Sequence, residues 1–492
     1  MRNYRSSAIR AIICLAILLP FLASSCSQKY AVDYKQLKYP TLGQIEIPQV
    51  RRVTLANGMQ VFLLEDHELP LVSLSAMVRT GSVYEPADKI GLAAITGAVM
   101  RTGGTTSKTG DQIDEQLEQI AASVETGIGP NVGGASMSVL KEDVDTGLSI
   151  LADVLMNPAF REDKIELAKI AHRSSIARRN DFPFSIAFRE YTKLIYGPES
   201  VYARHTEYAT IDNITRDDLV AFHKKFFHPN NTTLAVWGDF DAEQMTKKIE
   251  EAFKAWDKAD AKPAVPSAAL RAGVPQVRYE FRPTVNVIQK EEMNQSCICL
   301  GHIGGMMNDP DYFALVVMNE ILGGSFTSRL FKNVRSRMGL AYAVFGVYSA
   351  DYDHPGVFYV GCQTKSKSTA QAIRAMSEEV KKITEAEVTD EELALAKESY
   401  LNSFVFNFDS RAEIVRRLMI YHYFGYPEDF LQKTKDNVEK VTKADVLRVA
   451  RKHLQPDKMQ ILAVGRPQDF DEPLSVFGQV REIDITIPQP QK

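Results

Sequence analysis

The feature that most constrains the fold of this chain is an internal repeat: five residues of the first half recur in the second half, and every pair is separated by the same number of residues. Five residue types recur at this spacing: a Thr, an Asp three residues later, a Lys, a Pro, and a Gly that ends an apolar strand. The pairs are Thr215/Thr442, Asp218/Asp445, Lys225/Lys452, Pro229/Pro456 and Gly238/Gly465. Because Thr215 is typical of a helix N-cap, the unit predicts a helix followed by a strand. Constant spacing over five pairs indicates that one αβ unit has been duplicated.

The length of the chain agrees with a duplication. Its 492 residues, of which 45% are hydrophobic and 24% charged, are too many for one core and suit two domains of roughly 200 residues each. A segment rich in Ala and Pro separates the two copies and is typical of a linker. We therefore expect a first domain over residues 45–256, a linker over 257–279, a second domain over 280–480 and a tail over 481–492.

The charge of the chain argues against one class of partner. The formal net charge is −4, and the sequence contains no long run of Lys or Arg. Binding to phosphate backbones needs a concentrated basic surface. We therefore expect no nucleic-acid partner.

Residues 1–25 have the pattern of an export signal. Three basic residues come first, followed by an apolar run over residues 11–23 that is too short to span a membrane comfortably. The basic residues are Arg2, Arg5 and Arg10. The pattern predicts that the chain is exported.

The end of this signal predicts a lipid anchor. The run Leu22-Ala23-Ser24-Ser25-Cys26 resembles the cleavage box of bacterial lipoproteins, with Cys26 as the lipidated first residue. The alternative is an ordinary signal that is cut near Ser24 or Ser25. With residues 26–44 as a polar spacer, we expect a protein of the bacterial cell envelope that is tethered to a membrane and faces the periplasm. Ser27 is compatible with an outer membrane, in a bacterium that has one.

Three cysteines remain in the folded body, namely Cys297, Cys299 and Cys362. An odd number argues against a disulfide framework. Cys297 and Cys299 could suggest a metal site, but they lie two residues apart in an apolar run. That spacing predicts buried residues of a β-strand.

Three segments of the first half carry a family resemblance. They are Gly81-Ser82-Val83-Tyr84-Glu85, Gly91-Leu92-Ala93 and Thr102-Gly103-Gly104-Thr105. Together they resemble the first domain of the pitrilysin/insulinase family, which includes the mitochondrial processing peptidases. The resemblance covers roughly residues 45–467 and implies two homologous α+β domains, each a mostly antiparallel sheet flanked by helices. In active relatives the helix after Gly-Leu-Ala carries H-x-x-E-H, where two His bind zinc and the Glu deprotonates the bound water.

In this chain the same frame reads Ala94-Ile95-Thr96-Gly97-Ala98, so Ala94 and Ala98 replace the two His and Gly97 replaces the general base. The family takes a third ligand from a Glu in a later helix, just before an Asp-x-Pro element. Matching that element to residues 181–183 places Ser175 at the ligand position and Ala168 at a supporting acidic position. A shift of one residue would select Ser174 instead. None of these side chains suits zinc, so the frame predicts a packed apolar helix.

Another histidine cluster does not replace the lost motif. His223 and His228 are five residues apart, which turns them about 140° from each other on a helix. The nine histidines form neither H-x-x-E-H nor H-E-x-x-H. We expect no metal or cofactor in this chain.

The second half carries the family's second signature, over residues 322–330 and 334–342. In active relatives an Arg and a Tyr seven residues apart reach from this segment to the scissile peptide. Here the resemblance assigns these roles to Arg335 and Tyr342, with Arg337 as the alternative cation. A guanidinium and a phenol can hold a peptide carbonyl and favour the oxyanion that develops on it. The plain alternative is that Arg335 solvates a helix end while Tyr342 packs in a strand.

These observations lead to a hypothesis about function. The chain would be the non-zinc, substrate-binding subunit of an exported two-chain metallopeptidase, and a homologous partner would carry the zinc. Two such chains would enclose a clamshell chamber that takes unfolded peptides and binds them by adding a strand to a sheet edge. One alternative is a catalytically silent peptide-binding or scaffold protein at the membrane surface. Another is a metallopeptidase that acts alone, which would require stoichiometric zinc.

Overall fold

A computed structural model describes residues 48–259, 274 and 276–489. These residues belong to one compact unit, which begins at residue 46. The export signal, Cys26, the spacer and most of the linker lie outside the described residues. Residues 48–259 are called the first half below, and residues 276–489 the second half.

The first half is built on a six-stranded sheet with the order β1-β2-β6-β3-β5-β4. Only β2 and β6 pair in parallel. The strands are β1 (Arg51–Thr54), β2 (Gln60–Glu65), β3 (Leu71–Val78), β4 (Ser123–Ile128), β5 (Gly133–Leu140) and β6 (Thr232–Gly238). The hairpin between β1 and β2 turns at Gly58, where φ is +87°, a value that glycine adopts without strain.

Helices cover one face of this sheet and form the first core with it. They are α2 (Leu92–Thr102), α3 (Gly110–Gln119), α4 (Val144–Met156), α5 (Glu162–Ala177), α7 (Tyr208–Asp212), α8 (Arg216–Phe226) and α9 (Ala242–Ala252). On β2, Val61 and Leu63 enter this core, while Phe62 and Leu64 point to the opposite face. Both faces of the sheet are therefore covered.

The second half repeats this architecture with the order β10-β12-β8-β13-β7-β14. Its strands are β7 (Thr284–Gln289), β8 (Gln295–Ile303), β10 (Ala341–Tyr348), β12 (Val357–Lys365), β13 (Gln460–Gly465) and β14 (Val480–Glu482), and β9 (Gly305–Met306) pairs separately with β11 (Ala350–Asp351). Its helical segments are α11 (Tyr312–Asn319), η5 (Glu320–Gly324), η6 (Phe331–Arg337), α12 (Thr369–Glu385), α13 (Asp390–Phe404), α15 (Phe430–Lys440) and α16 (Lys443–His453). Five strands correspond in order, and only the edge strands β1 and β14 pair differently. The predicted duplication of an α+β unit is confirmed.

The repeated Thr and Asp begin equivalent helices. At the start of α8, the Thr215 hydroxyl accepts a hydrogen bond from the backbone N–H of Asp218, whose carboxylate accepts one from the N–H of Thr215. Thr442 and Asp445 make the same reciprocal bonds at the start of α16. Each pair satisfies two backbone donors that would otherwise lack partners at a helix N-terminus.

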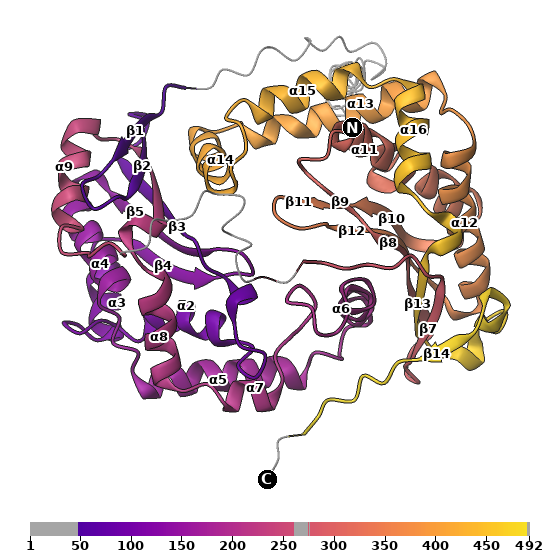
Figure 1. The fold of residues 1–492 in the computed structure, drawn as a ribbon, viewed down its shortest axis with the longest axis horizontal. Helices are drawn as coiled ribbons and strands as arrows, with labels where there is room; N and C mark the ends of the chain where they lie inside the picture. Colours follow the sequence, from indigo (N-terminus) through magenta and orange to yellow (C-terminus); the bar gives the residue numbers. More distant parts are fainter. Residues whose placement is uncertain (1–47, 260–273, 275, 490–492) are drawn as a thin grey trace, which may run out of the picture. The chain divides into compact units, whose positions relative to one another are not determined.

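Each half also gives one helix to the other. The helix α6 (Pro183–Tyr196) packs on the second sheet, and α14 (Arg411–Phe424) packs on the first sheet (Figure 1). The Tyr196 hydroxyl donates a 2.7 Å hydrogen bond to Pro355 O, and the Tyr423 hydroxyl donates one of the same length to Asn131 O. The two tyrosines have the same spacing as Thr215 and Thr442, so the duplication includes this exchange.

The three cysteines are free and buried, and the burial of Cys297 and Cys299 in a strand agrees with the prediction from their spacing. Cys297 and Cys299 face α6, and Cys362 lies in the core on the other side of the sheet. Burial raises the pKa of Cys297 to about 11 and that of Cys299 to about 12. Protonated, enclosed thiols of this kind suit packing and do not suit metal binding.

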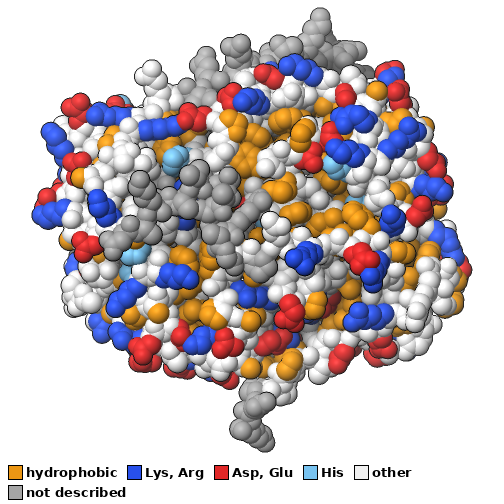
Figure 2. Space-filling model, viewed as in Figure 1, with side chains coloured by type: hydrophobic (Ala, Val, Ile, Leu, Met, Phe, Trp, Pro, Cys, Tyr) orange, Lys and Arg blue, Asp and Glu red, His pale blue; other side chains and the backbone are white. Residues whose placement is uncertain are grey.

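The surface shown in Figure 2 has basic and acidic side chains interspersed, with hydrophobic side chains between them. Within the described ranges, no helix is both long enough and apolar enough to cross a membrane.

Candidate functional site

The helix α2 holds the positions at which active relatives bind zinc. It begins after Gly91, whose φ of +110° favours glycine. The Glu85 carboxylate is buried beside this end and accepts a 2.6 Å hydrogen bond from the N–H of Ala93. Burial raises the pKa of Glu85, and the bonds from the helix N-terminus oppose that rise. Further along α2, Ala94 is half-buried and Ala98 is exposed, and neither methyl group can bind a metal.

Gly97 lies directly against the backbone of β4. A Cβ atom at this position would come 2.4 Å from the N of Ile128 and 2.7 Å from the carbonyl C of Gly127. The Thr126 hydroxyl also donates a 2.6 Å hydrogen bond to Gly97 O. The helix is therefore held too close to β4 for any side chain at residue 97. A glutamate base could not occupy this position unless α2 and β4 moved apart.

The helix α5 carries the third ligand position. Ser175 and Ser174 are exposed, and Ala168 packs against the first core. His172 lies four residues after Ala168 and three before Ser175, so it shares their face of the helix. Sequence analysis overlooked His172, although this spacing could have revealed it. Desolvation lowers its pKa, and it has no hydrogen bond to a described residue. One imidazole with no second ligand cannot make a zinc site.

The rings of His223 and His228 each form a hydrogen bond with a backbone carbonyl group. The His223 ring donates to Leu155 O at 2.8 Å, and the His228 ring donates to Lys224 O at 2.7 Å. They do not share a site.

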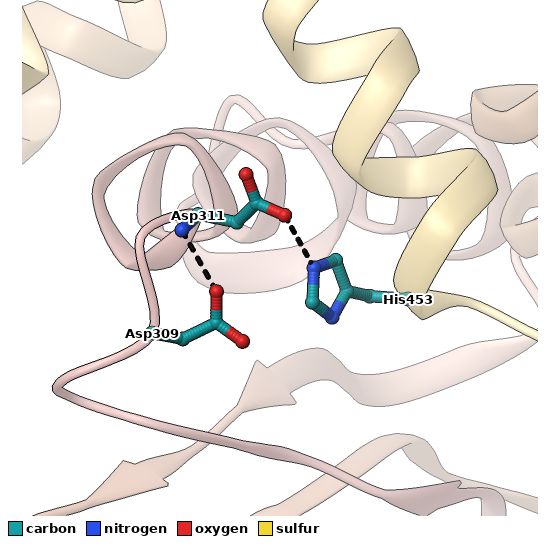
Figure 3. Close-up of side chains that lie close together, drawn as sticks. All are labelled: Asp309, Asp311 and His453. Atoms are coloured by element: carbon teal, nitrogen blue, oxygen red, sulfur yellow. Dashed lines mark hydrogen bonds and ion pairs between the residues drawn. The ribbon is translucent and has the colours of Figure 1, made fainter.

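One cluster of potential metal ligands occurs among the described residues, and it consists of Asp309, Asp311 and His453 (Figure 3). Three side chains already donate hydrogen bonds to Asp311: Lys452 at 2.6 Å, His453 at 2.8 Å and Arg448 at 2.6 Å. Burial alone would raise the pKa of Asp311, but these hydrogen bonds outweigh it and hold that pKa well below its ordinary value. A metal ion would have to displace them, so the geometry indicates a structural link between the end of α16 and the start of α11.

Arg335 on η6 and Tyr342 on β10 lie close to each other. The Arg335 guanidinium carbon is 4.7 Å from the ring centroid of Phe331 and 5.9 Å from that of Tyr342. Tyr342 is 78% exposed and lies in a register shift between Ala341 and Ala343, where the regular pairing of β10 is interrupted. Neither the Arg335 side chain nor the Tyr342 side chain makes a hydrogen bond or ion pair with a described residue. Aromatic rings thus hold the guanidinium while its N–H groups stay available.

Arg337, the alternative cation, lies where its charge acts on α12. It is exposed on η6, and its charge helps Lys382 to lower the pKa of Glu378 on α12. Of these two arginines, Arg335 is the one that lies over the Tyr342 ring. The geometry therefore favours Arg335 as the cation of the pair.

A second surface feature lies at the free edge of the first sheet. Among the described strands β4 is the last one there, and a pocket of about 470 Å³ lies between it and α14. Small residues of the sheet, including Gly127, Gly134 and Ser136, form its floor, and Met419 and Ile420 form its wall. An open strand edge beside such a pocket suits an extended peptide.

Comparison with known proteins identifies the family. Residues 60–193 match the model described as Insulinase (Peptidase family M16), and residues 213–400 match the Peptidase M16 inactive domain. The "Uncharacterized zinc protease YmxG" of Bacillus subtilis is 24% identical over 73% of this chain and 85% of that protein. The "Non-peptidase homolog YmxG" of Helicobacter pylori is 23% identical over 82% of this chain and 90% of that protein.

Solved structures share the fold. A Pseudomonas fluorescens structure described as a peptidase M16 inactive domain has a TM-score of 0.74 and 24% identity, and it covers 85% of this chain and 98% of its own. A Helicobacter pylori structure described as a protease has a TM-score of 0.71 and 18% identity, and it covers 85% of this chain and 99% of its own. With two family models matching in order and this shared fold, the chain belongs to the insulinase family of peptidases, family M16.

Proposed function

We propose that this chain is the substrate-binding, zinc-less subunit of a two-chain zinc metallopeptidase. Its partner would be a homologous chain with an intact H-x-x-E-H helix. One contrast between the halves carries the proposal. In the first half, Gly97 lies directly against β4 and leaves no space for a catalytic base. In the second half, the side-chain donors of Arg335 and Tyr342 have no partner among the described residues and lie beside the edge strand β10.

The residues of this chain would act by holding the substrate. The partner's zinc would supply the activated water. The Arg335 guanidinium and the Tyr342 hydroxyl would donate hydrogen bonds to the carbonyl oxygen of the scissile peptide. These bonds strengthen as negative charge develops on that oxygen, so they favour the transition state over the bound substrate. Neither group needs to transfer a proton.

The substrate class follows from the strand edges. Unfolded peptides can offer backbone donors and acceptors to an edge strand such as β4 or β10, whereas folded proteins cannot do so without unfolding locally. We infer that the two-chain peptidase acts on extended peptides. In line with its N-terminal sequence, we also propose that the chain is exported, anchored through a lipid on Cys26 and placed in the periplasm of the bacterial envelope.

Variants of the pair test this proposal. In a complex reconstituted with the zinc-bearing homologue, Arg335→Ala or Tyr342→Phe should lower kcat/KM for peptide cleavage by about 100-fold, because each removes a donor to the oxyanion. Arg337→Ala is the matched control and should change kcat/KM by less than about twofold. Equal effects of all three variants, or none, would contradict the assigned roles.

A second candidate is a catalytically silent peptide-binding or scaffold protein. The close contact between α2 and β4 at Gly97 favours it, as does a relative that is named a non-peptidase homolog. Under this candidate, Arg335→Ala would leave the cleavage rate of any co-purified peptidase unchanged.

A further inference from the structure

Four aromatic side chains form a partly exposed surface on the second half, called the aromatic shelf here. Phe184 and Phe188 come from α6, Phe345 from β10 and Tyr359 from β12. The ring centroids lie 5.5 Å apart for Phe184 and Phe345, 5.8 Å for Phe345 and Tyr359, and 5.6 Å for Phe188 and Tyr359. Each ring thus contacts at least one other, in a continuous series.

The shelf differs from the rest of the packing of α6. Ile186 and Tyr191 on the same helix are fully buried against the second sheet. Phe184 and Phe188, in contrast, remain 45% and 42% exposed. Large rings with this much exposure are costly to hydrate, and their grouping indicates a binding surface.

The backbone of β12 leaves room for one of these rings. A Cβ atom at residue 361 would come 2.8 Å from Cζ of Phe345, so Gly361 makes room for that ring on β12. Val344 on β10 enters the helix-covered core, and Phe345 points to the opposite face, where α6 lies. The ring therefore lies against Gly361 of the sheet and beside the contributed helix.

The position of the shelf identifies its ligand. The strand β10 is the last strand of the second sheet, with no further strand beside it among the described residues. A peptide that pairs with this edge projects alternate side chains onto the face that carries the shelf. Phe345 follows Tyr342 by three residues, about 10 Å along a strand. One extended peptide can therefore contact both. The shelf contains no charged group, so it suits an apolar side chain.

We propose that the aromatic shelf binds an aromatic or large aliphatic side chain of an extended peptide that pairs with the free edge of β10. This inference deepens the proposed function and rests on it for the role of the peptide as substrate. It adds a preference: substrates carry a large apolar residue a few positions from the bond held at Tyr342.

Peptide binding to the full chain tests the shelf without the partner or zinc. Two fluorescein-labelled peptides of about a dozen residues are used, identical except for Phe or Ser at one central position, and their Kd values are measured by anisotropy. The Phe peptide should bind about tenfold more tightly, equivalent to about 1.4 kcal/mol. Phe184→Ser or Phe188→Ser should remove most of that difference and leave the Kd of the Ser peptide unchanged.

Phe182→Ser is the matched control, because Phe182 is 64% exposed in the residue next to α6 and outside the series of rings. It should leave both Kd values unchanged. The proposal is overturned if the Phe peptide shows no preference, if Phe182→Ser has the same effect, or if a benzoylphenylalanine version of the peptide cross-links to β4 instead of α6 or β10. It is also overturned if the shelf variants prevent assembly with the homologue and leave peptide binding intact, because the shelf is then a subunit interface. An inactive pair with an intact Phe preference would instead refute only the proposed function.

Discussion

At the scale of single residues, Gly97 leaves no space for the glutamate that active relatives carry in this helix. Alanines at residues 94 and 98 remove ligands and leave the backbone unchanged, whereas glycine at residue 97 lets α2 settle against β4. The space that a catalytic glutamate would need is filled by strand backbone. Restoring the two histidines alone would therefore leave the site without a base.

The close approach at Gly97 predicts an unusual mutational effect. In an ordinary helix, Gly→Ala stabilises by about 1 kcal/mol. Here Gly97→Ala should instead lower the free energy of unfolding by about 2 kcal/mol, because the new methyl group overlaps the backbone of β4. Urea denaturation measures the difference.

Gly127→Ala on the facing strand provides the control for this measurement. A Cβ atom there meets nothing within 4 Å, so the free energy of unfolding should change by less than about 0.5 kcal/mol. A Gly97→Ala variant that is as stable as the wild type would mean that α2 does not press on β4.

Residue-level prediction from the sequence was strongest where chemistry depends on side-chain type. Ala94 and Ala98 have no atom that can bind zinc, and the neutral hydroxyl of Ser175 is a poor ligand for it, so the motif frame alone was enough to predict the loss of the ligands. The closeness of Gly97 to β4 could not be predicted, because it depends on a helix and a strand that the whole of α3 separates in the sequence. The sandwiching of Arg335 between two rings was equally hidden, since its spacing from Tyr342 does not specify a side-chain direction.

At the scale of elements, the exchanged helices α6 and α14 join the two halves. Leu418 and Met419 on α14 pack with Phe62 of the first sheet, and Ile186 on α6 packs with Leu462 of the second. The capped repeat helices, the strands that follow them and the strand with Cys297 and Cys299 were predicted from the sequence, because each depends on local patterns. The exchange was not visible, since the apolar face of a helix does not specify which of two similar sheets it will cover.

The exchange predicts that the halves unfold together. Both tryptophans, Trp237 and Trp256, lie in the first half, so their fluorescence reports on that half alone. Far-UV circular dichroism reports on both halves. Because each half loses a core helix when the other unfolds, the two signals should give coincident urea transitions. A fluorescence transition that precedes the dichroism transition would show that the halves are independent.

At the scale of the whole molecule, the duplication has produced two halves with different capacities. The first half keeps a strand edge and a pocket but has a closed helix in place of a metal site. The second half presents Arg335 and Tyr342, whose side-chain donors have no partner among the described residues, next to the aromatic shelf. We therefore propose that this chain supplies the substrate-binding part of an active site that a second chain completes.

Metal analysis tests this central claim most directly. Zinc is measured by mass spectrometry in the chain purified alone and in the complex captured through this chain from the native envelope. The account predicts well under one zinc per chain in the isolated protein, and about one zinc per pair in a complex that contains a homologue with H-x-x-E-H. Stoichiometric zinc in the isolated chain, or a native chain that is always monomeric, would contradict it.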